Sequence, residues 1–276
     1  MKCQFRLATL ATLLLATPAL AQEEVVDDGS DNFTIGLGAS YVPSYEGSDD
    51  YQISGAALLR GRVSGFTFYS RATALYFDLI REAPNAPLNV ELGPMANVRV
   101  DRSSRIEDDR VEALGELDTA IELGGFAGLT KNGVLHGYDF LTARIDVVRD
   151  VTDTHDSTVI APNLEYGTPL STTFFIGASL SAEHVGGRYA RTYYGVTPAG
   201  ALASGLAPYD PDGGWKNARG TLLGTWSLSG DLRRGLALFA VGSYSRMLGD
   251  FKRSPIVADA GDADQYFAAL GLSYTF

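Results

Sequence analysis

The sequence of 276 residues predicts an all-β chain that closes into an antiparallel, membrane-spanning β-barrel of about twelve strands. The first observation is segment 265–276, where apolar side chains at alternate positions form one face and small or polar residues the other. The second is strand length: the longer alternating segments run about 11 to 14 residues, long for a β-sandwich and suited to a tilted membrane crossing. The third is that no apolar run of about 18 residues follows the N-terminal region, which excludes helical spans.

The N-terminal region divides into two parts. Residues 1–21 carry Lys2 and Arg6, then an apolar run and a small-residue motif ending at Ala21, which predicts a cleaved secretory signal peptide. Residues 22–32 are acidic and lack periodicity, so we expect a flexible periplasmic segment before a barrel over residues 33–276. The single cysteine lies inside the signal, so the exported chain has no thiol for a disulfide or a thiolate metal site.

Period-2 alternation continues from residue 33 to the C-terminus. Between Phe66 and Ile80 the apolar phase changes from even to odd positions, which two strands or one bulged strand would explain. Both termini should be periplasmic, which requires an even number, so twelve strands are predicted and ten are the alternative. The twelve segments are 33–42, 51–61, 65–71, 73–81, 88–101, 118–129, 138–149, 157–168, 171–184, 215–229, 234–248 and 265–276.

The links between these segments alternate in length. In the twelve-strand register the short links fall on the periplasmic side and the long ones, 102–117, 185–214 and 249–264, fall outside. The 185–214 link is too long to lack structure of its own. We expect it to fold inward, with Tyr193, Tyr194 and Tyr209 capping the mouth of the lumen.

The polar faces of several segments carry charges of both signs, which a closed barrel would direct into its lumen. Charges removed from water must be paired, so the first interpretation is an ion-pair network that fills and stiffens the barrel. The alternative is a constricted pore whose charges select small solutes. The residues concerned are Glu91, Arg99, Asp101, Glu122, Arg144, Asp146, Glu165, Glu183 and Arg219.

Charge and histidine usage argue against several functions. The chain has 33 acidic and 22 basic residues, and loss of Lys2 and Arg6 leaves 20 basic residues and a net charge of −13. Nucleic-acid binding, which needs a basic face, is therefore disfavoured. None of the three histidines has the spacing of a metal site, and we interpret them as ordinary solvated residues, with a lipid hydrolase built on His184 as the alternative.

Two acidic loops, 209–214 and 259–264, contain oxygen ligands of the kind that Ca²⁺ prefers. Neither follows the pattern of a helix–loop–helix calcium site, so we interpret them as solvated turns. The sequence thus predicts no catalytic residue, no metal site and no cofactor.

Several motifs resemble those of the MipA/OmpV family of outer-membrane proteins. The glycine-rich opening strand runs into a P-S-Y-E-G-S motif at Pro43, and Y-Y-G-V begins at Tyr193. S-P-I-V begins at Ser254, ahead of the closing strand that ends at Phe276. The family is named for a member that interacts with the murein-degrading transglycosylase MltA.

The resemblance implies a non-enzymatic barrel in the outer membrane of a Gram-negative cell. Family members are described as scaffolds for peptidoglycan-synthesising and -degrading enzymes, or as porin-like proteins. The expected partners are outer-membrane lipid and lipopolysaccharide, murein enzymes, and the barrel-assembly machinery, for which Tyr274 and Phe276 form the assembly signal. The alternative function is a narrow gated channel or a small-molecule-binding barrel.

Overall fold

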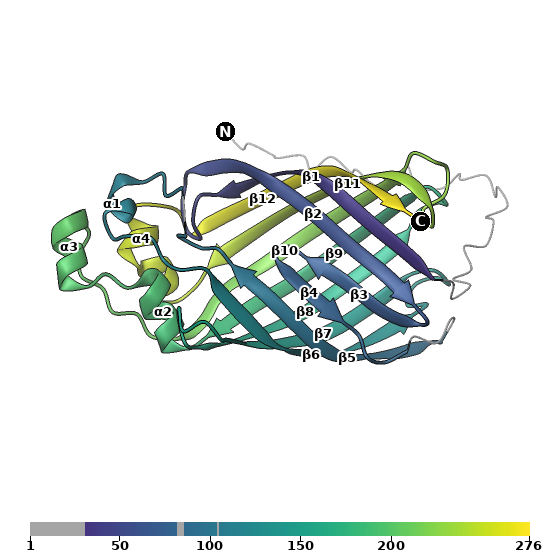
Figure 1. The fold of residues 1–276 in the computed structure, drawn as a ribbon, viewed down its shortest axis with the longest axis horizontal. Helices are drawn as coiled ribbons and strands as arrows, with labels where there is room; N and C mark the ends of the chain where they lie inside the picture. Colours follow the sequence, from purple (N-terminus) through teal and green to yellow (C-terminus); the bar gives the residue numbers. More distant parts are fainter. Residues whose placement is uncertain (1–30, 82–85, 104) are drawn as a thin grey trace, which may run out of the picture.

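The computed structural model describes residues 31–81, 86–103 and 105–276. Its twelve antiparallel strands close into one barrel, with each strand next to its sequence neighbours and β1 paired with β12 (Figure 1). The predicted signal peptide and residues 22–30 lie outside the described part of the chain. The twelve-strand fold is therefore confirmed, and the ten-strand alternative is wrong. The strands are β1 (Asn32–Pro43), β2 (Tyr51–Val63), β3 (Phe66–Arg71), β4 (Ala74–Phe77), β5 (Leu88–Arg99), β6 (Ala120–Asn132), β7 (Phe140–Asp150), β8 (Thr158–Pro169), β9 (Phe174–Val185), β10 (Gly214–Ser227), β11 (Gly235–Met247) and β12 (Asp264–Thr275).

Alternation along each strand separates a lipid-facing surface from a lumen. In β1, Leu37 points outward and is 68% exposed, whereas Ser40 points inward and is 6% exposed. Strand β12 continues the same division at the seam, where Leu37 pairs with Leu272. The N–H of Phe276 donates to the carbonyl of Phe33 at 2.9 Å, so the last residue completes the ring.

Aromatic side chains form two belts on the lipid-facing surface. Along β1, Phe33 and Tyr41 are eight residues apart, about 26 Å along the strand, which a tilt of about 40° reduces to a band about 20 Å tall. Such a band matches the apolar zone of a membrane barrel. The outer belt contains Tyr41, Tyr51, Trp215, Tyr244 and Tyr266, and the inner belt contains Phe33, Phe68, Trp226, Tyr274 and Phe276.

Strands β3 and β4 explain the change of apolar phase noted in the sequence. They form a short hairpin in which Phe68 pairs with Phe77 and the chain turns at Ala72, whose φ is 49°. The predicted strand 73–81 is shorter than expected, because its regular ladder ends at Phe77. Beyond that point only single backbone bonds continue, such as that from the N–H of Leu79 to the carbonyl of Leu92.

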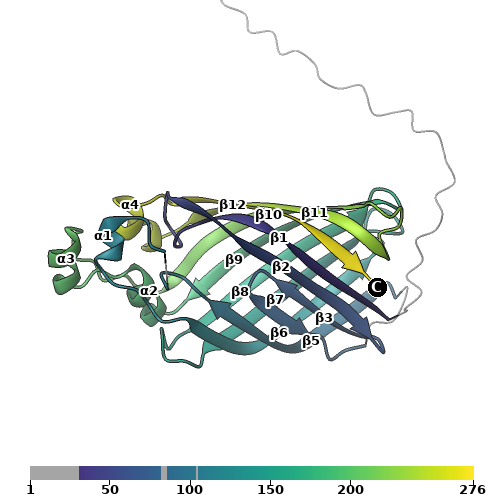
Figure 2. The ribbon, with the colours of Figure 1, turned by 45° about the horizontal axis from the view of Figure 1, so that its top comes forward.

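Short helices cap one end of the barrel, opposite the end marked C (Figures 1 and 2). They come from the long links, so the rule of short periplasmic turns and long external loops places this cap outside. A small apolar cluster that includes Tyr45, Val111 and Ile256 holds the loops together. No helix in the described residues is long and apolar enough to cross a bilayer. The helices are α1 (Asp109–Glu112), α2 (Gly187–Tyr194), α3 (Pro198–Ser204), η1 (Phe251–Arg253) and α4 (Pro255–Ala258).

Candidate functional site: the plugged lumen

Helix α2 enters the external mouth of the barrel and acts as a plug. Its residues Tyr189, Ala190, Tyr193 and Tyr194 are at most 1% exposed. The ring of Tyr189 lies 4.6 Å from that of Tyr193, and Tyr194 packs edge-on against Phe251 at 5.2 Å. Neighbouring loops hold the plug from above: the Ser254 hydroxyl donates to the carbonyl of Tyr194 at 2.7 Å. Tyr193 and Tyr194, two of the three tyrosines of the predicted loop cap, are thus buried among the external loops.

Lys216 joins the plug to the barrel wall. Its Nζ lies 2.7 Å from Glu46 Oε2 and 2.8 Å from Glu183 Oε2, and it donates to the Tyr189 hydroxyl at 3.1 Å. The Lys216 side chain is fully buried, so these three partners replace its water. The Tyr194 hydroxyl donates to the same Glu46 carboxylate at 3.0 Å. One carboxylate therefore contacts the β10 lysine and the plug helix at once.

A second group of charges lies beside Lys216. Arg99 donates to Glu122 at 2.9 Å, and its guanidinium lies 3.8 Å from Glu183. The Nε2 of His155 lies 3.0 Å from the same Glu122, whose side chain is fully buried. The Arg99 guanidinium stacks over the Tyr189 ring at 5.0 Å. We name Glu46, Arg99, Glu122, His155, Glu183 and Lys216 the plug network.

This arrangement shifts the pKa values of two acids in the external loops in opposite directions. Burial raises the pKa of Glu46, but the charges of Lys216 and Arg99, with the hydrogen bond from Lys216, together hold that pKa below its ordinary value. Burial, together with the negative charge of Glu46, raises the pKa of Asp101 to about 6. The Asp101 carboxylate accepts from the N–H of Glu46 at 2.8 Å, so the two acids meet where the β1–β2 loop touches the β5–β6 loop.

Deeper in the barrel a separate set of charges lines the lumen. Arg144 pairs with Asp146 at 2.7 Å and donates to the Tyr69 hydroxyl at 3.1 Å. Arg71 forms an ion pair with Glu165, and Glu91 accepts from the Thr130 hydroxyl at 2.5 Å. We name Arg71, Glu91, Arg144, Asp146 and Glu165 the mid-lumen network. Its mutual pairing matches what charges in a narrow lumen require.

Seven of the nine predicted lumen charges belong to these two networks in the structure. Arg99, Glu122 and Glu183 belong to the plug network, and Glu91, Arg144, Asp146 and Glu165 to the mid-lumen network. Arg219 lies on β10 with Ser181 and Ser245 as register neighbours. Asp101 lies outside the strands, in the external loop. Tyr209 is only at the edge of the cap, where its hydroxyl donates to the carbonyl of Asp250 at 3.0 Å.

Sequence reasoning missed four members of the site: Glu46, His155, Tyr189 and Lys216. Lys216 and Asn217 both point inward because a β-bulge interrupts the β9–β10 register between Trp215 and Asn217. Strict alternation places only one of two consecutive residues inside, so it could not find this pair. His155 was interpreted as a solvated residue, but it is 2% exposed and bound to Glu122, which corrects that interpretation.

The other candidate sites gain no support from the geometry. His184 packs edge-on against the outward-facing Trp215 at 5.3 Å, away from the serines of the lumen. Across residues 31–81, 86–103 and 105–276, no group of three or more acidic, histidine or cysteine side chains is arranged to hold a metal ion.

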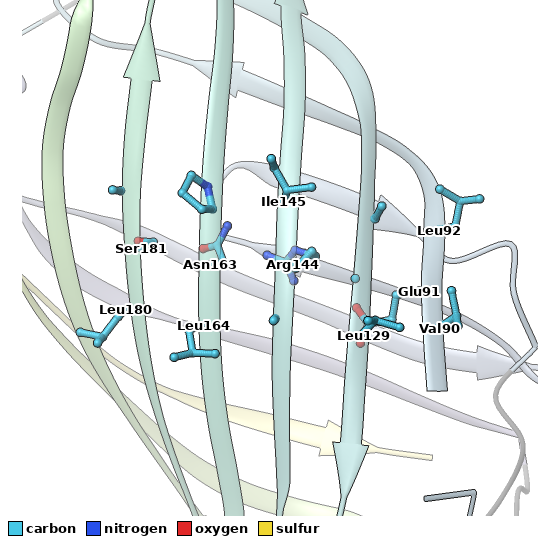
Figure 3. A pocket seen from close by; sticks show the side chains of 15 residues that line it. Val90, Glu91, Leu92, Leu129, Arg144, Ile145, Asn163, Leu164, Leu180 and Ser181 are labelled. Atoms are coloured by element: carbon cyan, nitrogen blue, oxygen red, sulfur yellow. The ribbon is translucent and has the colours of Figure 1, made fainter. Parts of the chain in front are cut away.

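A concavity of about 840 Å³ lies on the outer wall, across β5 to β9 (Figure 3). Leu129, Ile145, Leu164 and Leu180 line it, while Arg144 belongs to the lumen side of the same strands. The lining is mostly apolar, as expected for a surface that faces acyl chains.

The chain is similar to one protein family and to several solved structures. The profile of a protein family described as MltA-interacting protein MipA matches residues 35–276. No curated protein matches the chain. An outer membrane channel from Pseudomonas putida F1 aligns over 95% of this chain and 100% of its own, with 11% identity and a TM-score of 0.48. An anion-selective porin from Comamonas acidovorans aligns over 90% of this chain and 99% of its own, with 10% identity and a TM-score of 0.40.

Proposed function

This chain belongs to the MipA family, and from that premise we propose that it is a non-enzymatic outer-membrane barrel that acts as an interaction protein for murein-remodelling enzymes. The observation that carries the proposal is the plug. Its tyrosines are buried and its polar groups join the wall through Lys216 and Glu46, so in the described residues packed side chains occupy the outer mouth of the lumen. A barrel closed in this way serves better as a membrane-anchored platform than as a diffusion pore.

The charge networks then have a structural role. We propose that Glu91, Arg144, Asp146, Glu165 and Arg219 stiffen the barrel, while the plug network fixes the cap. Tyr274 and Phe276, in the inner aromatic belt, would be the signal for the barrel-assembly machinery. The lipid-facing surface would contact outer-membrane lipid and lipopolysaccharide.

The periplasmic turn between β6 and β7 is the docking point that we assign to this partner. Asp139 accepts from the N–H groups of Val134 and Leu135 at 2.7 and 2.9 Å, and from the Tyr166 hydroxyl at 2.8 Å. Despite its desolvation, these donors lower the pKa of Asp139 to about 2. The turn therefore stays ordered near neutral pH while it presents Leu135, which is 79% exposed. An apolar side chain on an ordered turn is a suitable anchor for a protein partner.

Photo-crosslinking in living cells tests this proposal. A photoreactive amino acid at Leu135 should capture a murein-cleaving enzyme of the MltA type, identified by mass spectrometry. The matched control is Leu202 on α3, which is 91% exposed at the opposite end of the barrel. Recovery of the same enzyme from both positions, or from neither, would contradict a periplasmic docking site.

A gated channel is the second candidate, and one observation favours it. Apart from its chain connections to β9 and β10, the plug is held in the mouth by non-covalent contacts, so weakening those contacts could open the lumen. The test is conductance in planar bilayers. The intact protein should be silent and a variant lacking residues 190–212 should conduct; silence of the folded deletion variant would remove the channel hypothesis.

A further inference from the structure

The wall of the barrel is interrupted in its outer half, between β2 and β5. Within the described residues, β2 pairs with β3 only through Arg60–Val63, and the β3–β4 hairpin turns back after Arg71. The edge of β2 from Ile53 to Leu58 therefore has no strand partner on that side among these residues. The short β3–β4 hairpin lies between β2 and β5 (Figures 1 and 2), and three strand spacings correspond to about 14 Å.

This interruption is framed on all sides, so it is a window and not an open slot. The bond between the N–H of Glu46 and Asp101 closes it on the extracellular side. The Thr73 hydroxyl, which donates to Asn97 at 2.9 Å, closes it on the periplasmic side. Tyr51 at the start of β2 belongs to the outer aromatic belt, so the free edge of β2 lies at bilayer depth. Unpaired backbone at that depth is tolerated only against protein or a polar cavity.

Side chains do not fill the window. Ser54 of β2 faces the lumen and is exposed, although Ser40, its register partner on β1, is 6% exposed. Gly55, the next residue, has no side chain that could cover the edge. Ala57, the next outward residue, is exposed as well. Small residues along the free edge thus leave space between the lumen and the lipid.

We propose that this window is a lateral binding site for a single-chain amphiphile with an uncharged polar head. The outward side chains of the frame, Ile53, Ala57 and Val98, are apolar and exposed, which suits an aliphatic chain on the bilayer side. On the lumen side Met95 and Tyr76 belong to a buried apolar cluster. The chain of the ligand would run from the bilayer through the window.

The head of the ligand would lie at the inner end of the window, beside Arg71. This residue ends β3, and its Nε is buried with no hydrogen-bond partner in the described part of the chain. A hydroxyl, ester or amide oxygen would supply the missing acceptor. A carboxylate or phosphate head is disfavoured, because the mid-lumen network already has three carboxylates against two guanidinium groups.

Lipid-phase quenching tests the site. In a Cys3→Ser background, Ser54→Cys and Ser40→Cys are each labelled with bimane and reconstituted in phosphatidylcholine vesicles. A monoacylglycerol brominated along its chain should quench the label at position 54 severalfold more than the label at position 40. Gly55→Phe, which places a ring over the window, should abolish most of that difference. The control Gly242→Phe, at an outward glycine with equal space on the fully paired strand β11, should leave it unchanged.

Each outcome bears on the proposal. Equal quenching at positions 40 and 54, or no response to Gly55→Phe, would overturn the window. Stronger quenching by a brominated fatty acid than by the monoacylglycerol would refute the uncharged head of the ligand. Quenching by a brominated phospholipid, without quenching by the monoacylglycerol, would refute a ligand with a single acyl chain. Heat-modifiable gel mobility verifies that each variant is folded. If Gly55→Phe does not fold, labelling of Ser54→Cys by a membrane-soluble maleimide, with Ser40→Cys unreactive, supports the window, and equal reactivity refutes it.

Discussion

Replacing Lys216 with methionine should loosen the plug while leaving the barrel intact. The ammonium lies within 2.8 Å of carboxylates from Glu46 and Glu183. Methionine keeps most of the side-chain volume but leaves both carboxylates without their cation. Removing one partner of a buried ion pair costs about 3 to 5 kcal/mol. Since the two carboxylate side chains keep 20% and 21% exposure, we expect a value near the lower limit, about 3 kcal/mol.

An energy of about 3 kcal/mol corresponds to a shift of roughly 150-fold in the opening equilibrium of the plug. Native-state hydrogen exchange measures this shift at the amides of residues 187–194. Exchange there should accelerate by roughly that factor, whereas the β11 and β12 amides should keep their protection. The double variant Lys216→Met/Glu46→Gln should recover part of the loss, since it removes one of the two uncompensated charges.

The matched control is Arg253→Met. Arg253 is paired with Asp250 in the same cap, but its side chain is 63% exposed, so its loss should matter little. Unchanged protection of residues 187–194 in Lys216→Met would refute the assignment of Lys216 as the link between plug and wall. Equal acceleration in both variants would show that the cap as a whole is loose.

Three further predictions concern single residues. Between its ordinary pKa and about pH 6, Asp101 is protonated in the folded protein but ionised in the unfolded chain, so folding is favoured as the pH falls through 6. The protection of the cap amides against hydrogen exchange should therefore be higher at pH 5 than at pH 7.5. Asp101→Asn should abolish this difference. Gly93→Ala places a Cβ 1.7 Å from the carbonyl oxygen of Phe77, so this variant should unfold at a lower temperature or fail to assemble. Gly242→Ala, where a Cβ has open space, should leave the thermal midpoint unchanged. Heat-modifiable gel mobility over a series of temperatures distinguishes the two variants. Asp139→Ala removes three accepted hydrogen bonds. It should accelerate amide exchange at Leu135 and weaken crosslinking from that position. Unchanged exchange would show that the turn does not depend on Asp139.

The sequence alone determined the barrel and its two faces. In a membrane strand, side chains alternate between lipid and lumen, so the period-2 pattern of a segment such as 265–276 is visible in one dimension. The same rule directed Glu122, Arg144 and Glu183 inward. The length of the 185–214 link also predicted that it has structure of its own, and from that we expected it to fold inward over the mouth.

Only the tertiary structure decided which charges meet and where the wall is open. Glu46 and Lys216 are 170 positions apart, and no local pattern specifies contact across a lumen. A β-bulge inverts the phase of β10 at Lys216, so alternation failed at the residue on which the plug depends. The window follows from the register between β2 and a short hairpin. Register depends on pairing between strands, and a period-2 pattern contains no information about where a neighbouring strand ends.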